Sequence, residues 1–373
     1  MRPYHDYTHD QEQKVRLVLV SGLDEETTLP QVQNLLQHTL DHDGHLSIGE
    51  HIYLKLKAGQ KGNFEENLQA GEESAGAILV YLHQPDHDQE AYPEAEFYGD
   101  PQLVGYAQLL AQPHNQPSRL LGELVVHPHL RNRALGRQLL RCMVELGRRG
   151  KLERLDVWSY HDNPQASLFA RQGGLSPTRV LHHLCLEASH TLPAYELPTD
   201  LRLRTFHLGQ DDTTWLALNR LVFAEHPENG TWTQADLELR FNQPWFDPHD
   251  FLVLEDQTGE ILGFNWTKRV PARQNDLHRS PAYPELVQPL PPLLGLPLGP
   301  SNGEIYIVGL HPSMRGRGLG RGLTLLGLYH LRLCGATLFS LYVDDTNTAA
   351  LKLYYSLGFK LDHNDVSYTL DLT

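Results

Sequence analysis

The chain has 373 residues, enough for two ordinary domains, and 40% of them are hydrophobic, as is typical of globular proteins. Its 46 acidic residues exceed its 31 basic ones, and the resulting formal charge of −15 argues against a nucleic-acid partner. The N-terminus has no apolar signal core, and no run reaches the roughly 18 apolar residues of a membrane span. We therefore expect a cytoplasmic protein with no membrane partner. The sequence does not show the oligomeric state, and a monomer is our expectation.

The first half of the chain predicts a mixed α/β unit. Hydrophobic periodicity indicates a strand at 122–126, a helix at 135–149, a strand at 152–160, a helix at 164–172 and a strand at 180–187. A segment with two prolines precedes the next strand, at 201–206, and reads as a linker at 191–200. The predicted domains are thus 1–190 and 201–373.

The second half repeats this order of elements. It predicts a strand at 304–310, a helix at 319–334, a strand at 337–343, a helix at 348–357 and a strand at 366–372. The stretch 270–302 is rich in proline and too long for an ordinary loop. It is either a disordered insertion or a cover over the neighbouring site.

Identical residues recur at one fixed spacing, 184 positions (315 minus 131). The pairs are Arg131 and Arg315, Gly136 and Gly320, Asn163 and Asn347, Ala166 and Ala350, and Gly174 and Gly358. A constant offset over this length indicates two tandem copies of one fold.

The cysteines and histidines indicate neither a disulfide framework nor a metal site. The three cysteines are odd in number, far apart and without CxxC spacing: Cys142, Cys185 and Cys334. Close histidine pairs occur at His127/His129 and His182/His183, but no helical ligand spacing such as HExxH accompanies them. We predict a reducing cytosol and no metal ligands.

The segment Val308–Gly320 reads as a strand, a glycine-rich turn and the start of a helix. This arrangement directs several backbone N–H groups, and the positive end of the helix dipole, at one point where an anion can bind. Gly318 lets the backbone approach closely, and Arg315 and Arg317 can offset phosphate charge. The spacing is neither that of a nucleotide-triphosphate loop nor GxGxxG, and a flexible turn with solvated arginines is the alternative.

These residues, with Asn347 and its helix, resemble the acetyl-coenzyme A motif of the GCN5-related N-acetyltransferase superfamily, over nearly the whole chain as two tandem domains. More narrowly, five segments of the second half resemble the mycothiol synthase family: 226–233, 244–248, 263–268, 303–309 and 341–344. The resemblance implies acetyl transfer from acetyl-CoA, as co-substrate, to the cysteinyl amine of a cysteinyl-glucosamine-inositol pseudo-disaccharide, the last step of mycothiol biosynthesis.

The resemblance also implies which residues bind the coenzyme. In the second copy they are Val308, Gly309, Leu310, Arg315, Gly316, Arg317, Gly318, Leu319, Gly320, Arg321, Asn347 and Lys352. In the first copy they are Leu124, Val125, Val126, Arg131, Arg133 and Gly136. Backbone N–H groups at 308–310 would polarise the thioester carbonyl.

Catalytic roles follow from the same resemblance. Glu304 matches the general base, with a solvated carboxylate at a strand start as the alternative. Tyr354 matches the general acid; its neighbour Tyr355 points about 100° away on a helix, and a core aromatic is the alternative for Tyr354. The implied acceptor contacts are Glu50, Glu228, Lys268, Glu304 and Tyr342, and each of these could instead be a surface side chain.

The first copy lacks the catalytic pair. At the offset of 184, Ala134 stands for Gly318, Leu120 for Glu304, and Ala170 for Tyr354. We therefore predict a non-catalytic first domain that either holds coenzyme structurally or serves as a scaffold. Two other functions stay open: a tandem acetyltransferase for another amine, such as an aminoglycoside or a protein N-terminus, and a non-catalytic acyl-CoA sensor.

Overall fold

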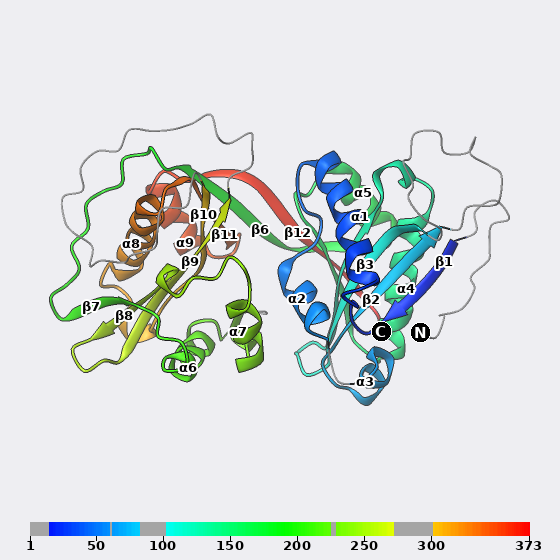
Figure 1. Ribbon diagram of the computed structural model, residues 1–373, viewed down its shortest axis with the longest axis horizontal. Coiled ribbons are helices and arrows are strands. Elements are labelled where there is room, and N and C mark those ends of the chain that lie inside the picture. The colour runs from blue at the N-terminus through cyan, green and yellow to red at the C-terminus, as the bar shows by residue number, and fades with distance from the viewer. Residues whose placement is uncertain (1–14, 60–61, 83–101, 225–228, 272–300) are drawn as a thin grey trace. The chain divides into compact units, whose positions relative to one another are not determined.

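The computed structural model describes residues 15–59, 62–82, 102–224, 229–271 and 301–373. They form two compact units, Met1–Val180 with Asn364–Thr373, and Leu181–His363 (Figure 1). Each unit is a mixed sheet with helices packed against it, so the predicted tandem α/β architecture is confirmed. The predicted linker at 191–200 lies inside the second unit, and the chain divides at Val180 instead.

The first unit contains most of the elements before the division. In chain order they are β1 Val15–Val20, α1 Thr28–Asp43, α2 Glu50–Ala58, α3 Phe64–Ala70, β2 Ser74–Leu82, β3 Gln102–Gln112, β4 Arg119–Val126, the 3-10 turn Pro128–Leu130, α4 Leu135–Arg149, β5 Arg154–Ser159, α5 Pro164–Gln172 and the start of β6 Ser176–Glu187. Strands β1 to β5 are neighbours in that order, antiparallel except for the parallel pair β4 and β5.

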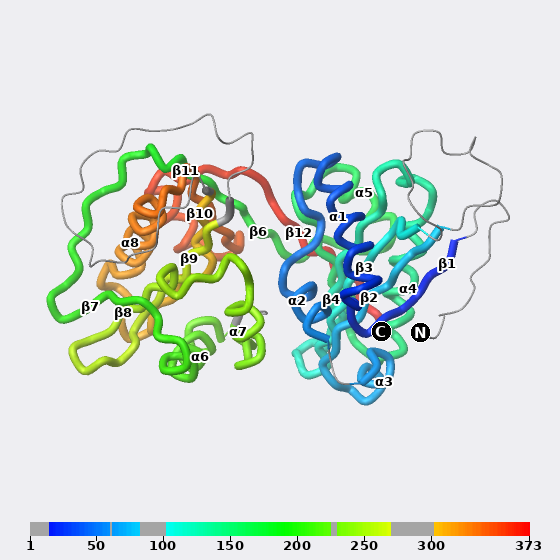
Figure 2. Tube along the Cα trace, in the orientation of Figure 1, coloured from blue at the N-terminus to red at the C-terminus, as the bar shows by residue number. Residues whose placement is uncertain are grey.

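The second unit repeats the pattern. Its elements are β7 Leu201–Thr205, α6 Asp212–Val222, the 3-10 turn Asn229–Thr231, α7 Gln234–Phe241, the 3-10 turn Pro248–Asp250, β8 Phe251–Asp256, β9 Ile261–Pro271, β10 Ser301–Leu310, the 3-10 turn Pro312–Met314, α8 Leu319–Leu333, β11 Ala336–Asp344, α9 Thr348–Ser356 and β12 Lys360–Asp371. Here β10 and β11 form the parallel pair. Figure 2 follows the chain from β10 into α8.

The last strands of the two copies are exchanged, which explains where the chain divides. Residues 366–371 of β12 pair with β5 in the first unit, and residues 181–187 of β6 pair with β11 in the second. Side-chain alternation is the same whichever sheet a strand joins, so the sequence pattern did not reveal this exchange.

Helices cover both faces of the second unit's sheet. On one face α8 and α9 pack against alternate strand residues such as Leu184, Leu341 and Val343. On the other face α6 and α7 pack against an aromatic layer that includes Phe264 and Trp266. Because strand side chains alternate, each strand residue can be assigned to one of these two faces.

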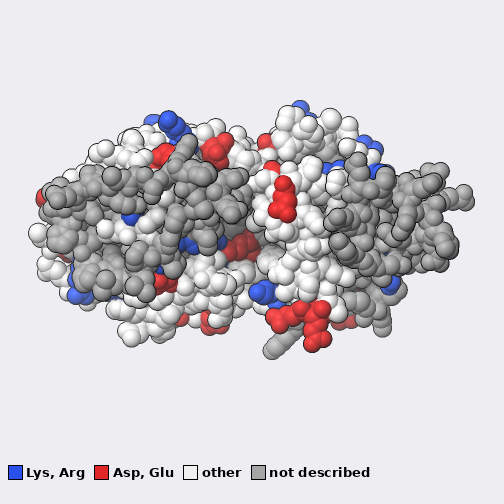
Figure 3. Space-filling model, turned by 45° about the horizontal axis from the view of Figure 1, so that its top comes forward, with Lys and Arg blue, Asp and Glu red and all other residues white. Residues whose placement is uncertain are grey.

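On the described surface seen in Figure 3, Lys and Arg form small separate groups. Among the described residues, no helix is long and apolar enough to cross a bilayer. Two predicted features, Glu228 and most of the proline-rich stretch 270–302, lie outside the described residues.

Candidate active site

Strands β10 and β11 are paired over only part of their length. Their parallel ladder ends at Ile305 and Leu341, while β10 continues beside β9 until Leu310 pairs with Gly263. The β11-facing edge of residues 307–310 therefore carries backbone amides outside the β10–β11 ladder. Backbone amides alternate along a strand, and the His311 amide donates to Leu262 on β9, so the Gly309 amide also faces β9. Of the three predicted donors, Val308 and Leu310 therefore direct their amides to the β11-facing edge, where pre-oriented amides can stabilise a developing oxyanion.

The glycine-rich turn leads from this edge into α8. Gly316 and Gly318 have φ of 80° and 75°, in the left-handed region that favours glycine. Leu319 is buried and anchors the first turn of α8 in the core. A Cβ added to Gly320 would meet no described atom within 4 Å, and its φ is not positive, so neither packing nor strain accounts for this glycine. Close approach of a ligand to the backbone would account for it.

Arg315 and Arg317, on the turn, are exposed, and Arg321, in the first turn of α8, is partly buried. Arg315 makes no side-chain hydrogen bond within the described residues, while Arg317 donates to Asp200 at 2.8 Å and Arg321 donates to Ser356 at 2.8 Å. The exposed ion pair between Arg317 and Asp200 is weak and is screened by salt, so an incoming anion can replace it. Lys352 is also exposed, on α9.

Helix α9 places two of the predicted residues. Asn347 is the N-cap, and its side-chain oxygen accepts a hydrogen bond from the Ala350 amide at 3.1 Å, which is a structural role independent of any coenzyme. Tyr354 is only 6% exposed, in the core between helix and sheet, whereas Tyr355 is 47% exposed. Burial raises the pKa of Tyr354 to about 12, so the phenol keeps its proton at neutral pH and can act as a donor.

Glu304 lies in a row of side chains that crosses the sheet. It pairs with Lys268 on β9 and with Ser340 on β11, and a bulge follows on β10 between Ile305 and Ile307. Gly303 approaches α8, so Glu304 faces the opposite side of the sheet, with Lys268. Tyr342 lies on the same face by alternation and is 44% exposed. Three of the predicted acceptor contacts therefore share one sheet face.

An aromatic wall lies against Lys268. Its ammonium is 4.4 Å from the ring centre of Trp245 and 5.3 Å from that of Tyr306, distances suited to cation–π attraction. Arg240 donates to the Tyr306 hydroxyl at 2.9 Å and stacks 3.6 Å from the Trp232 ring centre. The rings of Trp245 and Tyr306 are 5.2 Å apart. The wall combines aromatic rings with two basic side chains, a mixture that can pack against a polyhydroxyl ligand and hydrogen bond to it.

Sequence reasoning did not assign functional roles to the residues of this wall. Trp232, Trp245 and Tyr306 each stand inside one of the segments quoted above for the resemblance, and Arg240 lies between two of them. The aromatic residues inside these segments were therefore visible in the sequence, but only the fold shows that they lie against Lys268.

Glu50 is positioned by a buried network in the first unit. It opens α2, whose N-cap Gly49 donates its amide to the Glu123 carboxylate at 2.6 Å. Tyr160 and Gln108 donate to the same carboxylate, at 2.7 and 2.5 Å. This fixes the start of α2, and an added Cβ at Gly49 would collide with the Tyr160 hydroxyl.

The turn of the first copy keeps the backbone conformation of the second, but its arginine, Arg131, is paired within the protein. Asn132 and Ala134 take the left-handed φ of 63° and 62° that glycines adopt in the second copy. Arg131 makes a two-point ion pair with Asp43, at 2.8 and 2.5 Å. Burial would raise the pKa of Asp43, but hydrogen bonds from Arg131 and His42 lower it overall. Arg131, which matches Arg315, is thus already bound to a carboxylate of the protein itself.

The other predicted first-copy residues also differ from their counterparts. Leu120 and Ala170, which stand for Glu304 and Tyr354, are buried in the core and supply neither a base nor an acid. Leu124, Val125 and Val126 lie where β4 has left β5, whose ladder ends at Gly122 and Val157. Arg133 is exposed, and Gly136 packs near Phe169.

Comparison with known proteins defines the class. A model of the acetyltransferase (GNAT) family matches residues 65–174 and 215–359, one match in each copy. The protein is therefore a tandem acetyltransferase of this family. A mycothiol acetyltransferase of Acidothermus cellulolyticus is 38% identical over 91% of this chain and 90% of its own length. One of Thermobispora bispora is 42% identical over 73% of this chain and 81% of its own length. The chain belongs to the mycothiol acetyltransferases.

Solved structures support the fold. A tandem GNAT protein from the clavulanic acid biosynthesis pathway has a TM-score of 0.62 at 15% identity, covering 96% of this chain and 99% of that one. A GCN5-related N-acetyltransferase from Sphaerobacter thermophilus has a TM-score of 0.55 at 20% identity, covering 95% and 96%.

The two turns predict opposite effects of matched substitutions. Ala134→Gly should raise the free energy of unfolding by up to about 1 kcal/mol, because it relieves a left-handed alanine. Gly318→Ala should lower it by about 1 kcal/mol. Urea unfolding of both variants measures this, and two changes of the same sign would contradict it.

Proposed function

We propose that the second unit transfers the acetyl group of acetyl-CoA to the cysteinyl amine of the cysteinyl-glucosamine-inositol pseudo-disaccharide. The observation that supports this most directly is the convergence of the family segments. Trp232, Trp245, Lys268 and Tyr306, from four separate segments, meet beside Glu304. Tyr342, from the fifth segment, shares their sheet face. A site for another amine would not need these segments together.

We infer that coenzyme pyrophosphate binds at 315–320, where the N-terminus of α8 and the exposed Arg315 favour an anion. The thioester then extends along the β11-facing edge of β10, and the amides of Val308 and Leu310, which face this edge, stabilise its oxyanion. The arrangement requires no metal ion for this step, because the charge that develops on the carbonyl oxygen is met by backbone donors.

Two side chains, Glu304 and Tyr354, carry the proton transfers of the proposed reaction. An α-amine has an unperturbed pKa near 8 and is mostly ammonium at neutral pH, so Glu304 accepts one proton from it, directly or through water, and the neutral amine then attacks the carbonyl carbon. The carbon–sulfur bond breaks, the departing thiolate takes a proton from Tyr354, and the second proton of the nitrogen restores the Tyr354 phenol. Lys268 and Tyr342 hold the acceptor, and Glu50 and Glu228 stay proposed contacts.

We propose a supporting, non-catalytic role for the first unit. Its turn lacks an available counterpart of Arg315, because Arg131 is paired with Asp43. Coenzyme binding there is therefore weaker than in the second unit. A cytoplasmic location, a monomeric state and the absence of a nucleic-acid partner stay predictions.

Acceptor competition tests the proposed reaction. The purified protein is given acetyl-CoA with the cysteinyl pseudo-disaccharide, an aminoglycoside or a peptide with a free N-terminus, and thiol release is measured. We expect turnover with the pseudo-disaccharide and little with the others. Preference for another amine would overturn the acceptor, and coenzyme binding without turnover on any amine would favour the sensor.

A further inference from the structure

A group of metal-ligating side chains lies outside the catalytic residues, on the strands β6 and β12 of the second unit. His183 and Cys185 are on β6, and Asp362 is on β12. One ligand atom from each lies within 4.8 Å of the other two. The sequence predicted no metal site because these residues have no motif spacing; the pairing of two distant strands brings them together.

The distances within this group match those of a metal coordination sphere. His183 Nδ1 is 3.0 Å from Asp362 Oδ2 and 3.8 Å from Cys185 Sγ. Tetrahedral zinc, with ligand bonds of 2.0 to 2.3 Å, places its ligand atoms roughly 3.3–3.7 Å apart. The third pair, Cys185 Sγ and an Asp362 oxygen, lies within 4.8 Å, so side-chain rotation can bring the three atoms around one ion.

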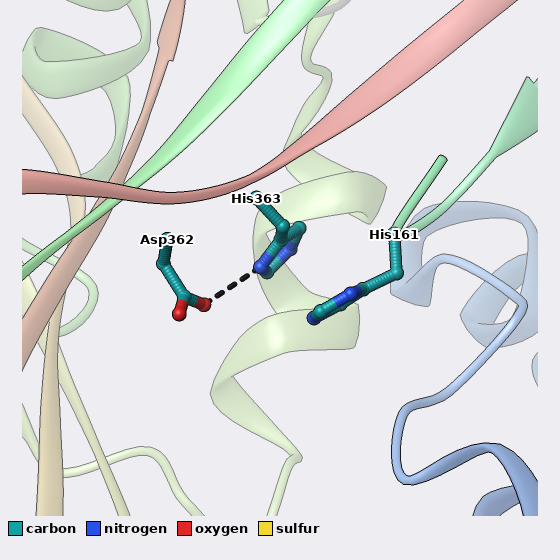
Figure 4. Close-up of side chains that lie close together, drawn as sticks. All are labelled: His161, Asp362 and His363. Carbon is teal, nitrogen blue, oxygen red and sulfur yellow. Dashed lines mark hydrogen bonds and ion pairs between the residues drawn. The ribbon is translucent and has the colours of Figure 1, made fainter. Parts of the chain in front are cut away.

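The surroundings also favour a bound cation. His363 Nδ1 hydrogen bonds to Asp362 Oδ2 at 2.8 Å and can orient that carboxylate, as outer partners of metal ligands do (Figure 4). A divalent cation binds cysteine as its thiolate, and the Asp362 carboxylate within 4.8 Å of Cys185 adds negative charge that favours a cation.

We propose that His183, Cys185 and Asp362 bind a zinc-class divalent cation, with one tetrahedral position left for water. The mixture of imidazole, thiolate and carboxylate is a borderline-soft set that suits zinc rather than magnesium or calcium. The site lies beside Tyr342, whose ring centre is 4.6 Å from that of His183.

A second group, Asp250, His330 and Cys334, has the same three ligand types but does not carry the proposal. Arg269 donates to Asp250 at 2.6 Å, and His330 donates to its other oxygen at 2.7 Å. The buried carboxylate is already neutralised by cations, so an added dication would leave excess positive charge in the core.

Cobalt(II) binding tests the proposal on the metal alone. The metal-free full-length protein is titrated with Co²⁺, and we expect one equivalent to produce a thiolate-to-cobalt charge-transfer band with the strong visible absorption of four-coordinate cobalt. Cys185→Ser should abolish the band. His183→Gln and Asp362→Asn should each weaken Co²⁺ binding about tenfold or more.

Matched cysteine variants provide the control. Cys142→Ser and Cys334→Ser should keep both the band and the affinity, and circular dichroism should show that every variant is folded. No thiolate band in the unsubstituted protein would overturn the proposal. So would a band that survives Cys185→Ser or disappears in Cys334→Ser. If Cys185→Ser does not fold, unchanged Co²⁺ affinity in His183→Gln and Asp362→Asn would overturn it equally.

Discussion

Glu304→Gln should lower kcat by about 10²–10⁴-fold while the KM for acetyl-CoA changes little. Glutamine keeps the size of the side chain beside Lys268 and Ser340 but cannot accept a proton from the acceptor amine. The defect should be smaller at pH 9 than at pH 7, because an α-amine with a pKa near 8 is then mostly deprotonated without help. Initial rates of thiol release across this pH range measure the effect.

Glu260→Gln is the matched control, since Glu260 is an exposed carboxylate on the turn between β8 and β9. It should leave kcat unchanged. Full turnover in Glu304→Gln would remove Glu304 from its role as base. A loss that is the same at pH 7 and pH 9 would instead indicate that Glu304 holds the acceptor rather than accepting its proton.

Local structure was the most predictable part of this protein. The helices predicted at 135–149 and 164–172 have the same limits as α4 and α5. Asn163 explains one of these limits, because its side chain accepts hydrogen bonds from the amides of Gln165 and Ala166. Periodicity and caps are local signals, and so the sequence contains them in full.

Long-range relations were not predictable in the same way. Arg131 reads as a coenzyme contact in the sequence, but Asp43, 88 positions earlier, engages it. Asn347 has the motif position of a coenzyme contact and also caps α9. The wall around Lys268 and the group around His183 depend on which strands are neighbours, which side-chain alternation leaves undetermined.

A buried charge network in the second unit has a large expected effect on stability. The Asp250 carboxylate accepts from Arg269 at 2.6 Å and from His330 at 2.7 Å, and all three side chains are buried. Desolvation lowers the pKa of His330, but the hydrogen bonds to Asp250 and Cys334 outweigh it and raise the pKa to about 9. The raised pKa favours the protonated imidazole at neutral pH, and the hydrogen bond joins α8 to Asp250.

Asp250→Asn should lower the free energy of unfolding by about 3–5 kcal/mol near pH 6.5, because two buried cations lose their shared counter-ion. The raised pKa of His330 means that its contribution to the free energy of unfolding is fully present below the unfolded pKa of 6.5 and is lost as pH rises through about 9. The difference in the free energy of unfolding between the unsubstituted protein and Asp250→Asn should therefore shrink by roughly 3 kcal/mol over that range. Urea unfolding at several pH values measures it, with Asp345→Asn, an exposed carboxylate, as the control. A difference that is constant with pH would show that His330 is neutral in the native state. The destabilisation that remains at pH 9 reports the loss of the ion pair with Arg269, which stays charged.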